Sequence, residues 1–123
     1  MTGLEAVAAA INHPGRLRQP RLSVEPLEVE RETVLVLRGE FDLTGVDVFK
    51  DAVARVRPRH ALVLDLRELS FLDSSGLGAM VELYRRAQAE GWSLVLAAPQ
   101  QAVAMILRIS GLDERLEIVE SAA

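Results

Sequence analysis

The chain of 123 residues contains no cysteine and only two histidines. Without thiols it can form no disulfide, no thiolate metal site and no cysteine nucleophile. His13 and His60 supply the only imidazole groups, too few for an elaborate zinc or iron site. We therefore expect neither a metal nor a cofactor.

Basic charge and long apolar runs are scarce as well. Lysine and arginine number 14 against 18 aspartates and glutamates, which gives a formal net charge of -4. Binding of nucleic acid without sequence preference needs a clustered basic surface, so we expect no direct nucleic-acid partner. No run of about 18 apolar residues is present to span a bilayer, and residues 1–11 lack the basic start of a secretory signal. We expect a cytoplasmic protein without membrane contact.

The residues that are present suit one hydrophobic core. The length is close to the usual size of a domain, and half of the residues are apolar, as in an ordinary globular protein. Near the amino terminus, the apolar pattern is interrupted at residues 12–15, NHPG, and a short basic stretch follows. We expect residues 1–20 to be a mobile tail and residues 21–120 to form a single domain.

Apolar runs that predict strands alternate with helical patterns after residue 21. Strands are predicted at 22–29, 34–37, 61–64, 94–97 and 116–118, and helices at 44–57, 75–90 and 99–110. Pro26 marks the first strand as an edge strand or a bulge. The strand at 61–64 is expected to end in residues 65–67, and a short polar bend is predicted between Arg67 and Phe71. The order β-β-α-β-α-β-α-β predicts an α/β fold with a mixed sheet, in which the buried strands pair in parallel through right-handed crossovers.

Local signals predict where the helices begin and end. Thr44 and Asp47 have the spacing of a capping box, and Pro58 is expected to end the helix that they begin. Pro99 suits the first position of the last helix. Gly111 suits the left-handed position just past the end of that helix.

Sequence patterns of common enzymes are weak or missing. Residues 76–78, GLG, weakly resemble a dinucleotide-binding fingerprint, but Val81 stands where the third glycine belongs. The glycine-lysine-serine pattern of a phosphate-binding loop is absent. Ser74 and Ser75 lack the glycine spacing of a nucleophile elbow, and neither histidine is placed to activate them.

Two polar features remain to be explained. Asp42, Asp65 and Asp73 could gather at one end of the sheet, which leaves open a small nucleotide-binding or hydrolytic protein. Residues 73–78, DSSGLG, have the pattern of a capped helix start, but their glycines weaken the helix and let another backbone approach closely. A phosphate on a serine there would face amide groups and the positive end of the helix dipole.

At this motif the chain resembles a known family. Residues 62–66, LVLDL, followed by residues 71–78, FLDSSGLG, are similar to the signature of STAS domains, and specifically to bacterial anti-sigma-factor antagonists. Residues 37–44, LRGEFDLT, are a weaker match in which Phe41 replaces a common leucine. The resemblance covers about residues 22–120 and implies the STAS fold.

The resemblance implies a switch by exchange of partners. Such proteins bind an anti-sigma factor that is also a serine kinase, and the sigma factor is released. The kinase phosphorylates the second serine of the motif, which is Ser75 here, and a metal-dependent serine phosphatase restores the binding form. The resemblance assigns partner binding to Asp42, Asp73, Ser74, Gly76 and Leu77. It implies a phosphoprotein that is monomeric when free and is not an enzyme.

A second interpretation keeps the fold and changes the partner. Related STAS modules serve as stress-signalling scaffolds or as accessory subunits in lipid transport, and the sequence separates these groups only weakly. The intact pair of Ser74 and Ser75 favours the phosphorylation switch.

Overall fold

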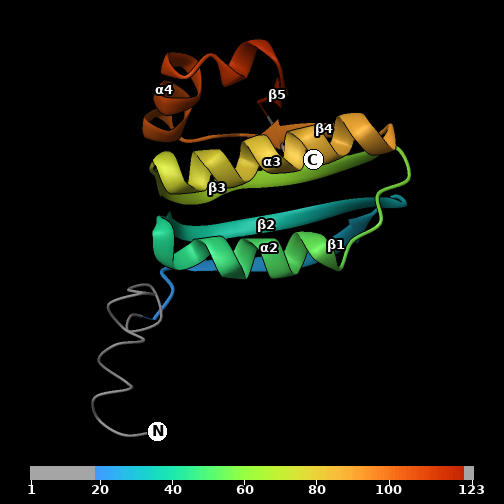
Figure 1. The fold of residues 1–123 in the computed structure, drawn as a ribbon, viewed down its shortest axis with the longest axis horizontal. Coiled ribbons are helices and arrows are strands. Elements are labelled where there is room, and N and C mark those ends of the chain that lie inside the picture. Colours follow the sequence, from blue (N-terminus) through green and yellow to red (C-terminus); the bar gives the residue numbers. More distant parts are fainter. Residues whose placement is uncertain (1–18, 121–123) are drawn as a thin grey trace, which may run out of the picture.

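The computed structural model describes residues 19–120, so the predicted tail, residues 1–20, lies almost wholly outside the described residues. Within the described part, five strands form one sheet on which helices pack (Figure 1). In chain order the elements are β1 (Leu22–Val29), β2 (Glu32–Phe41), the 3-10 turn η2 (Leu43–Gly45), α2 (Val46–Ala54), β3 (Ala61–Leu72), α3 (Ser74–Glu90), β4 (Ser93–Ala97), α4 (Gln101–Ile109), the 3-10 turn η3 (Leu112–Glu114) and β5 (Glu117–Val119).

The sheet is mixed, as predicted, and its strands lie in chain order. β1 and β2 form an antiparallel hairpin, and β2, β3, β4 and β5 pair in parallel. β1 is an edge strand in which Pro26 keeps regular register opposite Leu35, so there is no bulge at the proline. Because each parallel crossover joins neighbouring strands in the same direction, right-handed connections place their helices on one face. Figure 1 shows α2 and α3 in front of the strands.

The core lies between this face of the sheet and the helices. Leucines at alternate strand positions point into it and are at most 4% exposed: Leu35, Leu37, Leu62, Leu64, Leu66, Leu94 and Leu96. From α4, Val103 and Leu107 join them and are fully buried. Full burial of one such side chain contributes about 1.5–3 kcal/mol, so this layer holds the sheet and helices together. Among residues 19–120, no helix combines the length and the apolar character that a membrane crossing requires.

β3 is longer than predicted. The sequence predicts a polar bend after Arg67, but β3 continues to Leu72 and stays paired with β2. Register shifts opposite residues 36–40 change the spacing of the buried positions, so Leu66, Leu69 and Leu72 all lie in the core. The polar residues between these leucines are exposed, which gives this half of the strand the sequence pattern of a bend.

The start of α2 also differs from its prediction. The predicted capping box of Thr44 and Asp47 is wrong, because the amide and hydroxyl of Thr44 both donate to Asp42 and form the 3-10 turn η2. α2 begins only after this turn. It ends at Ala54, ahead of Pro58, so the proline does not set its end.

α4 begins later than predicted and ends as predicted. Ala98 has a φ of 52°, and this turn of the chain leaves Pro99 outside the helix, which begins at Gln101. Pro99 is therefore not the first helical residue. Gly111 has a φ of 78° beyond the end of α4, which confirms its left-handed position.

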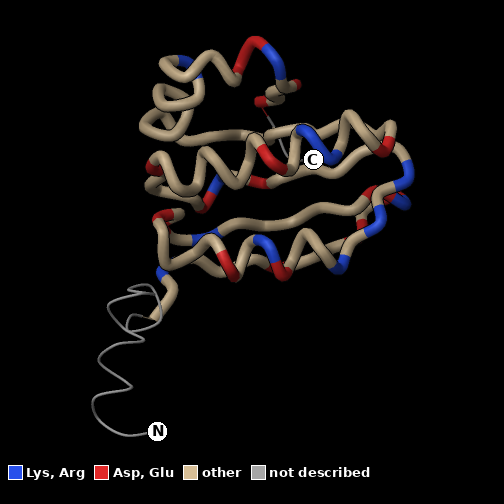
Figure 2. Tube along the Cα trace, in the orientation of Figure 1, with Lys and Arg blue, Asp and Glu red and all other residues tan. Residues whose placement is uncertain are grey.

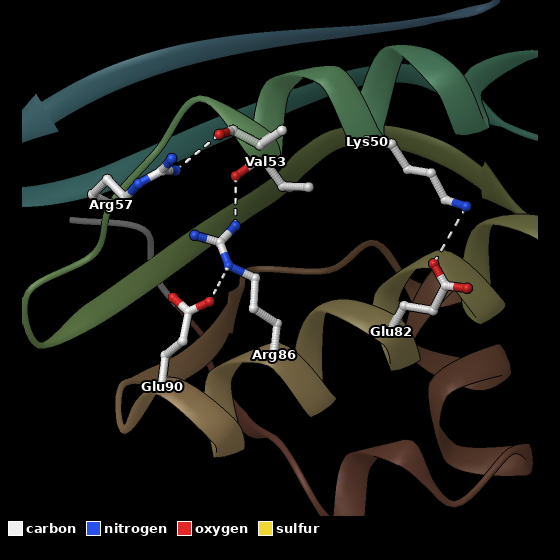
Figure 3. A pocket seen from close by; sticks show the side chains of 7 residues that line it. Lys50, Val53, Arg57, Glu82, Arg86 and Glu90 are labelled. Atoms are coloured by element: carbon white, nitrogen blue, oxygen red, sulfur yellow. Dashed lines mark hydrogen bonds and ion pairs between the residues drawn. The ribbon is translucent and has the colours of Figure 1, made fainter.

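Polar contacts hold α2 and α3 side by side (Figure 3). The guanidinium of Arg86 donates to the carbonyl oxygen of Val53 at 2.6 Å and to that of Val56 at 2.9 Å. Lys50 and Glu82 form an ion pair at 3.4 Å. Both helices follow neighbouring parallel strands, so the two helix starts lie at the same end of the sheet. The polar contacts keep the helices aligned there.

Candidate functional site

Two turns lie next to each other where β2 and β3 end. β2 leads into Asp42 and β3 leads into Asp73, and the last residues of the two strands are register partners. The amide of Asp73 donates to the carbonyl oxygen of Phe41 at 3.2 Å, which joins the two turns directly. The predicted motif at residues 73–78 therefore sits at the start of α3, beside the turn that carries Asp42.

Asp73 is the cap of α3. Its backbone is extended, and its Oδ1 accepts hydrogen bonds from the amides of Ser75 at 2.8 Å and Gly76 at 3.1 Å. A short carboxylate in this position satisfies amides that have no partner within the helix. The motif thus acts as a helix start, as predicted, and the cap fixes the backbone on which Ser74 and Ser75 stand.

The two serines differ in exposure. Ser74 is exposed and Ser75 is half-buried. Neither hydroxyl makes a hydrogen bond to a described residue, although the amide of Ser75 is held by Asp73. Leu77, one position beyond Gly76, is half-buried beside them.

The two glycines of the motif have different surroundings. A Cβ on Gly76 would lie 2.6 Å from a methyl carbon of Leu72 and 2.7 Å from the ring of Phe41, so this position needs glycine for packing. Gly78 is exposed and has nothing within 4 Å of an added Cβ. Gly76 therefore shapes the site from the interior, and Gly78 leaves the surface open.

Asp42 is held by the turn that it caps. It accepts from the amide of Thr44 at 2.9 Å and from the hydroxyl of the same residue, and Arg21 lies 3.9 Å away. The hydrogen bond from the Thr44 hydroxyl is the main reason why the pKa of Asp42 lies below its ordinary value. Asp42 is therefore a charged and well-ordered neighbour of the serine motif.

Asp65 does not join the other two aspartates. It lies within β3, opposite Val36 of β2 and Ala97 of β4, roughly 20–25 Å of strand before Asp73. Burial acts to raise the pKa of Asp65, but hydrogen bonds from Arg67 at 2.8–3.2 Å outweigh it and the pKa is lowered. The predicted gathering of three carboxylates is therefore wrong. Residues 19–120 contain no group of three side chains suited to hold a metal ion.

Two exposed apolar residues at this end were not predicted. Leu43, next to Asp42, is 56% exposed, and Phe71, two residues before Asp73, is 45% exposed. Each flanks one of the two turns. Strict alternation would place Phe71 on the same side as buried Leu69, but the register shift between Gly39 and Glu40 turns it outward, so the sequence pattern gives no signal of its exposure.

Comparisons with known proteins agree with this geometry. The family model described as Mlab, STAS domain, matches residues 27–120. A STAS-domain containing protein of Pseudomonas aeruginosa is 36% identical over 90 residues, which cover 72% of this chain and 88% of that protein. The anti-sigma F factor antagonist of Paenibacillus polymyxa is 31% identical over 104 residues, or 77% of this chain and 88% of that protein.

The structural comparison extends the match to the fold. The solved structure of the anti-sigma factor antagonist SpoIIAA in its unphosphorylated form has a TM-score of 0.67 and 25% identity, over 78% of this chain and 87% of that one. The resemblance found in the motif is thus matched by a family model over most of the chain and by the arrangement of strands and helices. The chain belongs to the STAS domain family.

Proposed function

We propose that this protein is an anti-sigma-factor antagonist that is switched off by phosphorylation of Ser75. The end of the sheet that carries Asp42, Asp73, Ser74, Gly76 and Leu77 binds an anti-sigma factor that is a serine kinase, and the sigma factor is released. Phosphorylation of Ser75 by that kinase ends the binding, and a serine phosphatase restores it. The protein is a regulator and a kinase substrate, not a catalyst.

The observation that carries this proposal is the difference between two hydroxyl groups. The hydroxyl of Thr44 is bonded to Asp42, whereas the hydroxyl of Ser75 makes no hydrogen bond to a described residue. Because no described residue bonds this hydroxyl, a kinase can reach and modify it without breaking a hydrogen bond among residues 19–120. The fixed cap at Asp73 holds the backbone in place, so the kinase meets a preorganised substrate.

The apolar residues beside the motif support a protein partner. Leu43 and Phe71 are about half exposed at the end of the sheet where the serines lie. Exposed apolar side chains gathered near polar groups are typical of protein interaction sites. The name of the Paenibacillus polymyxa relative, an anti-sigma F factor antagonist, supports an anti-sigma factor as that partner.

Charge explains how the switch works. A phosphate adds about -1.5 to -2 charges, and the amide end of α3 favours an anion by roughly 0.3–1 kcal/mol. Repulsion from Asp73 acts in the opposite direction with about 1 kcal/mol or more, so the fold keeps nearly the same stability. At the interface the new charge has no partner, and its burial is unfavourable by about 3–5 kcal/mol, which lowers the affinity about a hundred- to several-thousand-fold.

Reaction with kinases tests the assignment of the serine. Serine-kinase anti-sigma factors from the same genome are incubated with this protein, ATP and Mg²⁺, and the label is mapped by mass spectrometry. We expect label on the wild type and on Ser74→Ala, and none on Ser75→Ala. Both alanine variants should still bind the kinase in a pull-down without ATP, which separates loss of the acceptor from loss of the surface. Label on Ser74 alone would show that Ser74, and not Ser75, is the phosphorylated residue.

A STAS module with a different partner is the second candidate. It is favoured by the family model, which is described as Mlab, and by the Pseudomonas aeruginosa relative, which carries only the STAS description. This candidate predicts that no serine-kinase anti-sigma factor of the genome binds or labels the protein. It also predicts that Leu43→Asp, which places a charge on the proposed surface, still abolishes capture of the true partner. A nucleotide-hydrolysing protein is disfavoured because Asp65 is far from Asp42 and Asp73.

A further inference from the structure

A groove lies at the end of the sheet opposite to Ser75. It is bounded by the β1–β2 hairpin on one side and by the chain that follows α2 on the other, and it measures about 490 Å³. A volume of this size is within the range of small-molecule sites, about 300–1,000 Å³. Its apolar floor includes Leu27, which is 43% exposed, and the half-buried Val56.

Arginines dominate the charge of this groove. Arg55, Arg57 and Arg59 line the groove. Arg31 lines an adjoining hollow together with Arg57 and Arg59. Glu28 is the one carboxylate in both linings. Within residues 19–120 none of these four arginines forms an ion pair. Figure 2 shows several basic residues at this end, where the chain after α2 passes the hairpin, together with acidic residues of the hairpin.

Arginines elsewhere among residues 19–120 are of two kinds. Arg21, Arg38, Arg67 and Arg86 each lie within 4 Å of a carboxylate. Arg85, Arg108 and Arg115 form no ion pair either, but they are not part of the groove, where four arginines gather. Close to the groove, the carboxylate of Glu32 accepts from the amide of Ala61 at 3.2 Å and keeps its charge, so Glu28 and Glu32 together offset only two of the four arginine charges. The groove therefore retains positive charge in a protein whose formal net charge is -4.

Arg57 is held in place before any ligand arrives. Its Nη1 donates to the carbonyl oxygens of Ala54 at 2.9 Å and Val56 at 3.1 Å, at the end of α2. A guanidinium has five N–H donors, so Nε and Nη2 remain for an anion. Side chains that are already ordered lose less entropy when a ligand binds.

The position of Arg31 is unfavourable for the backbone. Glu30 and Arg31 form the two-residue turn between β1 and β2, and their φ angles are 51° and 73°. This left-handed turn strongly favours asparagine and glycine. A glycine at residue 31 would relax the turn, but it would remove a guanidinium from the rim of the groove.

We propose that this groove binds an organic phosphate. The phosphate lies against the guanidinium groups of Arg31, Arg57 and Arg59, whose planar forks match phosphate oxygens. The apolar part of the ligand covers Leu27 and Val56. The same chemistry is offered by a soluble phosphate ester and by the headgroup region of an anionic phospholipid.

The groove is independent of the proposed phosphorylation site. The two ends are separated by the length of β2, roughly 26 Å from Thr33 to Phe41. A substitution in the groove should leave phosphorylation of Ser75 unchanged. The phosphate site can therefore fail while the proposed switch stands, and the reverse also holds.

Titration calorimetry of the full chain with phenyl phosphate and with inorganic phosphate at low ionic strength tests the site. We expect saturable binding, tighter for phenyl phosphate because its ring covers the apolar floor. A flotation assay with phosphatidylcholine vesicles, with and without phosphatidic acid, separates the sources. Binding to the phosphatidic acid vesicles points to a lipid headgroup, and binding of phenyl phosphate alone points to a soluble ester. No saturable binding of any probe overturns the proposal.

A pair of glycine variants separates the ligand site from the turn. Arg31→Gly should raise the melting temperature and weaken phenyl phosphate binding, since loss of one charged hydrogen-bond donor corresponds to about ten- to a hundredfold. Glu30→Gly relaxes the same turn and keeps every arginine, so it should raise the melting temperature and leave binding intact. Equal weakening by both variants would contradict a role for the guanidinium.

A second pair keeps the test independent of the turn. Arg59→Gln should weaken phenyl phosphate binding by a similar factor. Arg108→Gln removes an exposed arginine on α4, outside the groove, and should have no effect. If Arg59→Gln and Arg108→Gln behave alike, the binding is non-specific attraction to positive charge, and the proposed site is wrong.

Discussion

The turns after β2 and β3 have the same backbone and use their hydroxyl groups differently. Asp42 has φ and ψ of -112° and -168°, Asp73 has -107° and -172°, and each accepts from the amide two residues later. At the first turn the residue two positions on, Thr44, also donates its hydroxyl to the aspartate, whereas Ser75 at the second turn does not. The same backbone structure thus bonds the hydroxyl to the aspartate at the first turn and leaves the Ser75 hydroxyl without a bond to Asp73 at the second.

The glycines of the two turns serve the same purpose. A Cβ on Gly45 would lie 2.8 Å from the side chain of Leu22, and one on Gly76 would lie 2.6–2.7 Å from Leu72 and Phe41. In both turns the glycine lets the helix start approach the strands closely. Packing therefore explains Gly76. The feature that distinguishes the second turn from the first is the hydroxyl groups of Ser74 and Ser75.

The largest expected effect comes from filling the space at these glycines. Gly76→Ala should lower the free energy of unfolding by about 1–3 kcal/mol, because the added methyl group overlaps two buried side chains. Gly45→Ala should have a similar effect, because the atom it meets at 2.8 Å is the Cβ of Leu22, which moves only with the backbone of β1. Urea denaturation measures both.

Gly78→Ala is the control for these substitutions. It meets no atom within 4 Å and should stabilise α3 by up to about 1 kcal/mol through helix propensity. If Gly76→Ala is also stabilising, the close packing at the start of α3 is not what requires glycine there.

Removal of the two caps should give the next largest effect. Asp73→Ala leaves two amides of α3 without a partner and should destabilise the protein by about 1–2 kcal/mol. Asp42→Ala releases one amide and the hydroxyl of Thr44, which can turn to another acceptor, and it should be less harmful, about 0.5–1 kcal/mol. Thermal melts compare the two, and the asparagine variants, which keep an acceptor oxygen, should recover much of each loss. A greater loss at Asp42 would contradict the view that Asp73 is the stronger cap.

Acid should destabilise the folded protein through two hydrogen-bonded carboxylates, Asp42 in the first turn and Asp65 within β3. The pKa values of Asp42 and Asp65 are lower in the folded protein than their ordinary values. The unfolded chain therefore binds more protons as the pH falls through the ordinary range, about 3.9 for aspartate, and stability is lost between that pH and the folded pKa. The melting temperature is measured at a series of pH values from 6 to 2. It should fall less with decreasing pH for Asp42→Asn and Asp65→Asn than for the wild type. Unchanged slopes would show that these hydrogen bonds do not favour the charged form.

The smallest expected effect is that of the amino-terminal residues. Deletion of residues 1–20 should leave the melting temperature and partner binding nearly unchanged, because the core formed by the described residues is continuous without them. A loss of several degrees on deletion would show that Leu4, Val7 and Ile11 pack on the domain. Differential scanning calorimetry of the two chains provides the comparison.

The fold could be predicted from the sequence because its strands are short apolar runs separated by helical patterns. The second half of β3 could not, because register shifts change the spacing of Leu66, Leu69 and Leu72 and expose the polar residues between them. Because the predicted strand is too short, Asp65 is expected at the end of the sheet. In the structure β4 ends opposite Asp65 while β3 continues beside β2.

The site was predictable where it depends on adjacent residues. The cap at Asp73 and the position of the serines at a helix start follow from residues 73–78 alone. The engagement of Thr44 with Asp42 and the exposure of Leu43 and Phe71 depend on how two distant turns meet at the ends of neighbouring strands. That meeting is a property of register, which local spacing does not reveal.

The most direct test of the account pairs a melt with a binding measurement on protein phosphorylated at Ser75. Calorimetric titration against the anti-sigma factor should show affinity reduced at least a hundredfold, about 3 kcal/mol or more. The melting temperature should stay within a few degrees of the unmodified protein, because the helix start and Asp73 act on the phosphate in opposite directions. A phosphoprotein that binds as tightly as the unmodified form, or that melts far lower, would contradict the electrostatic switch.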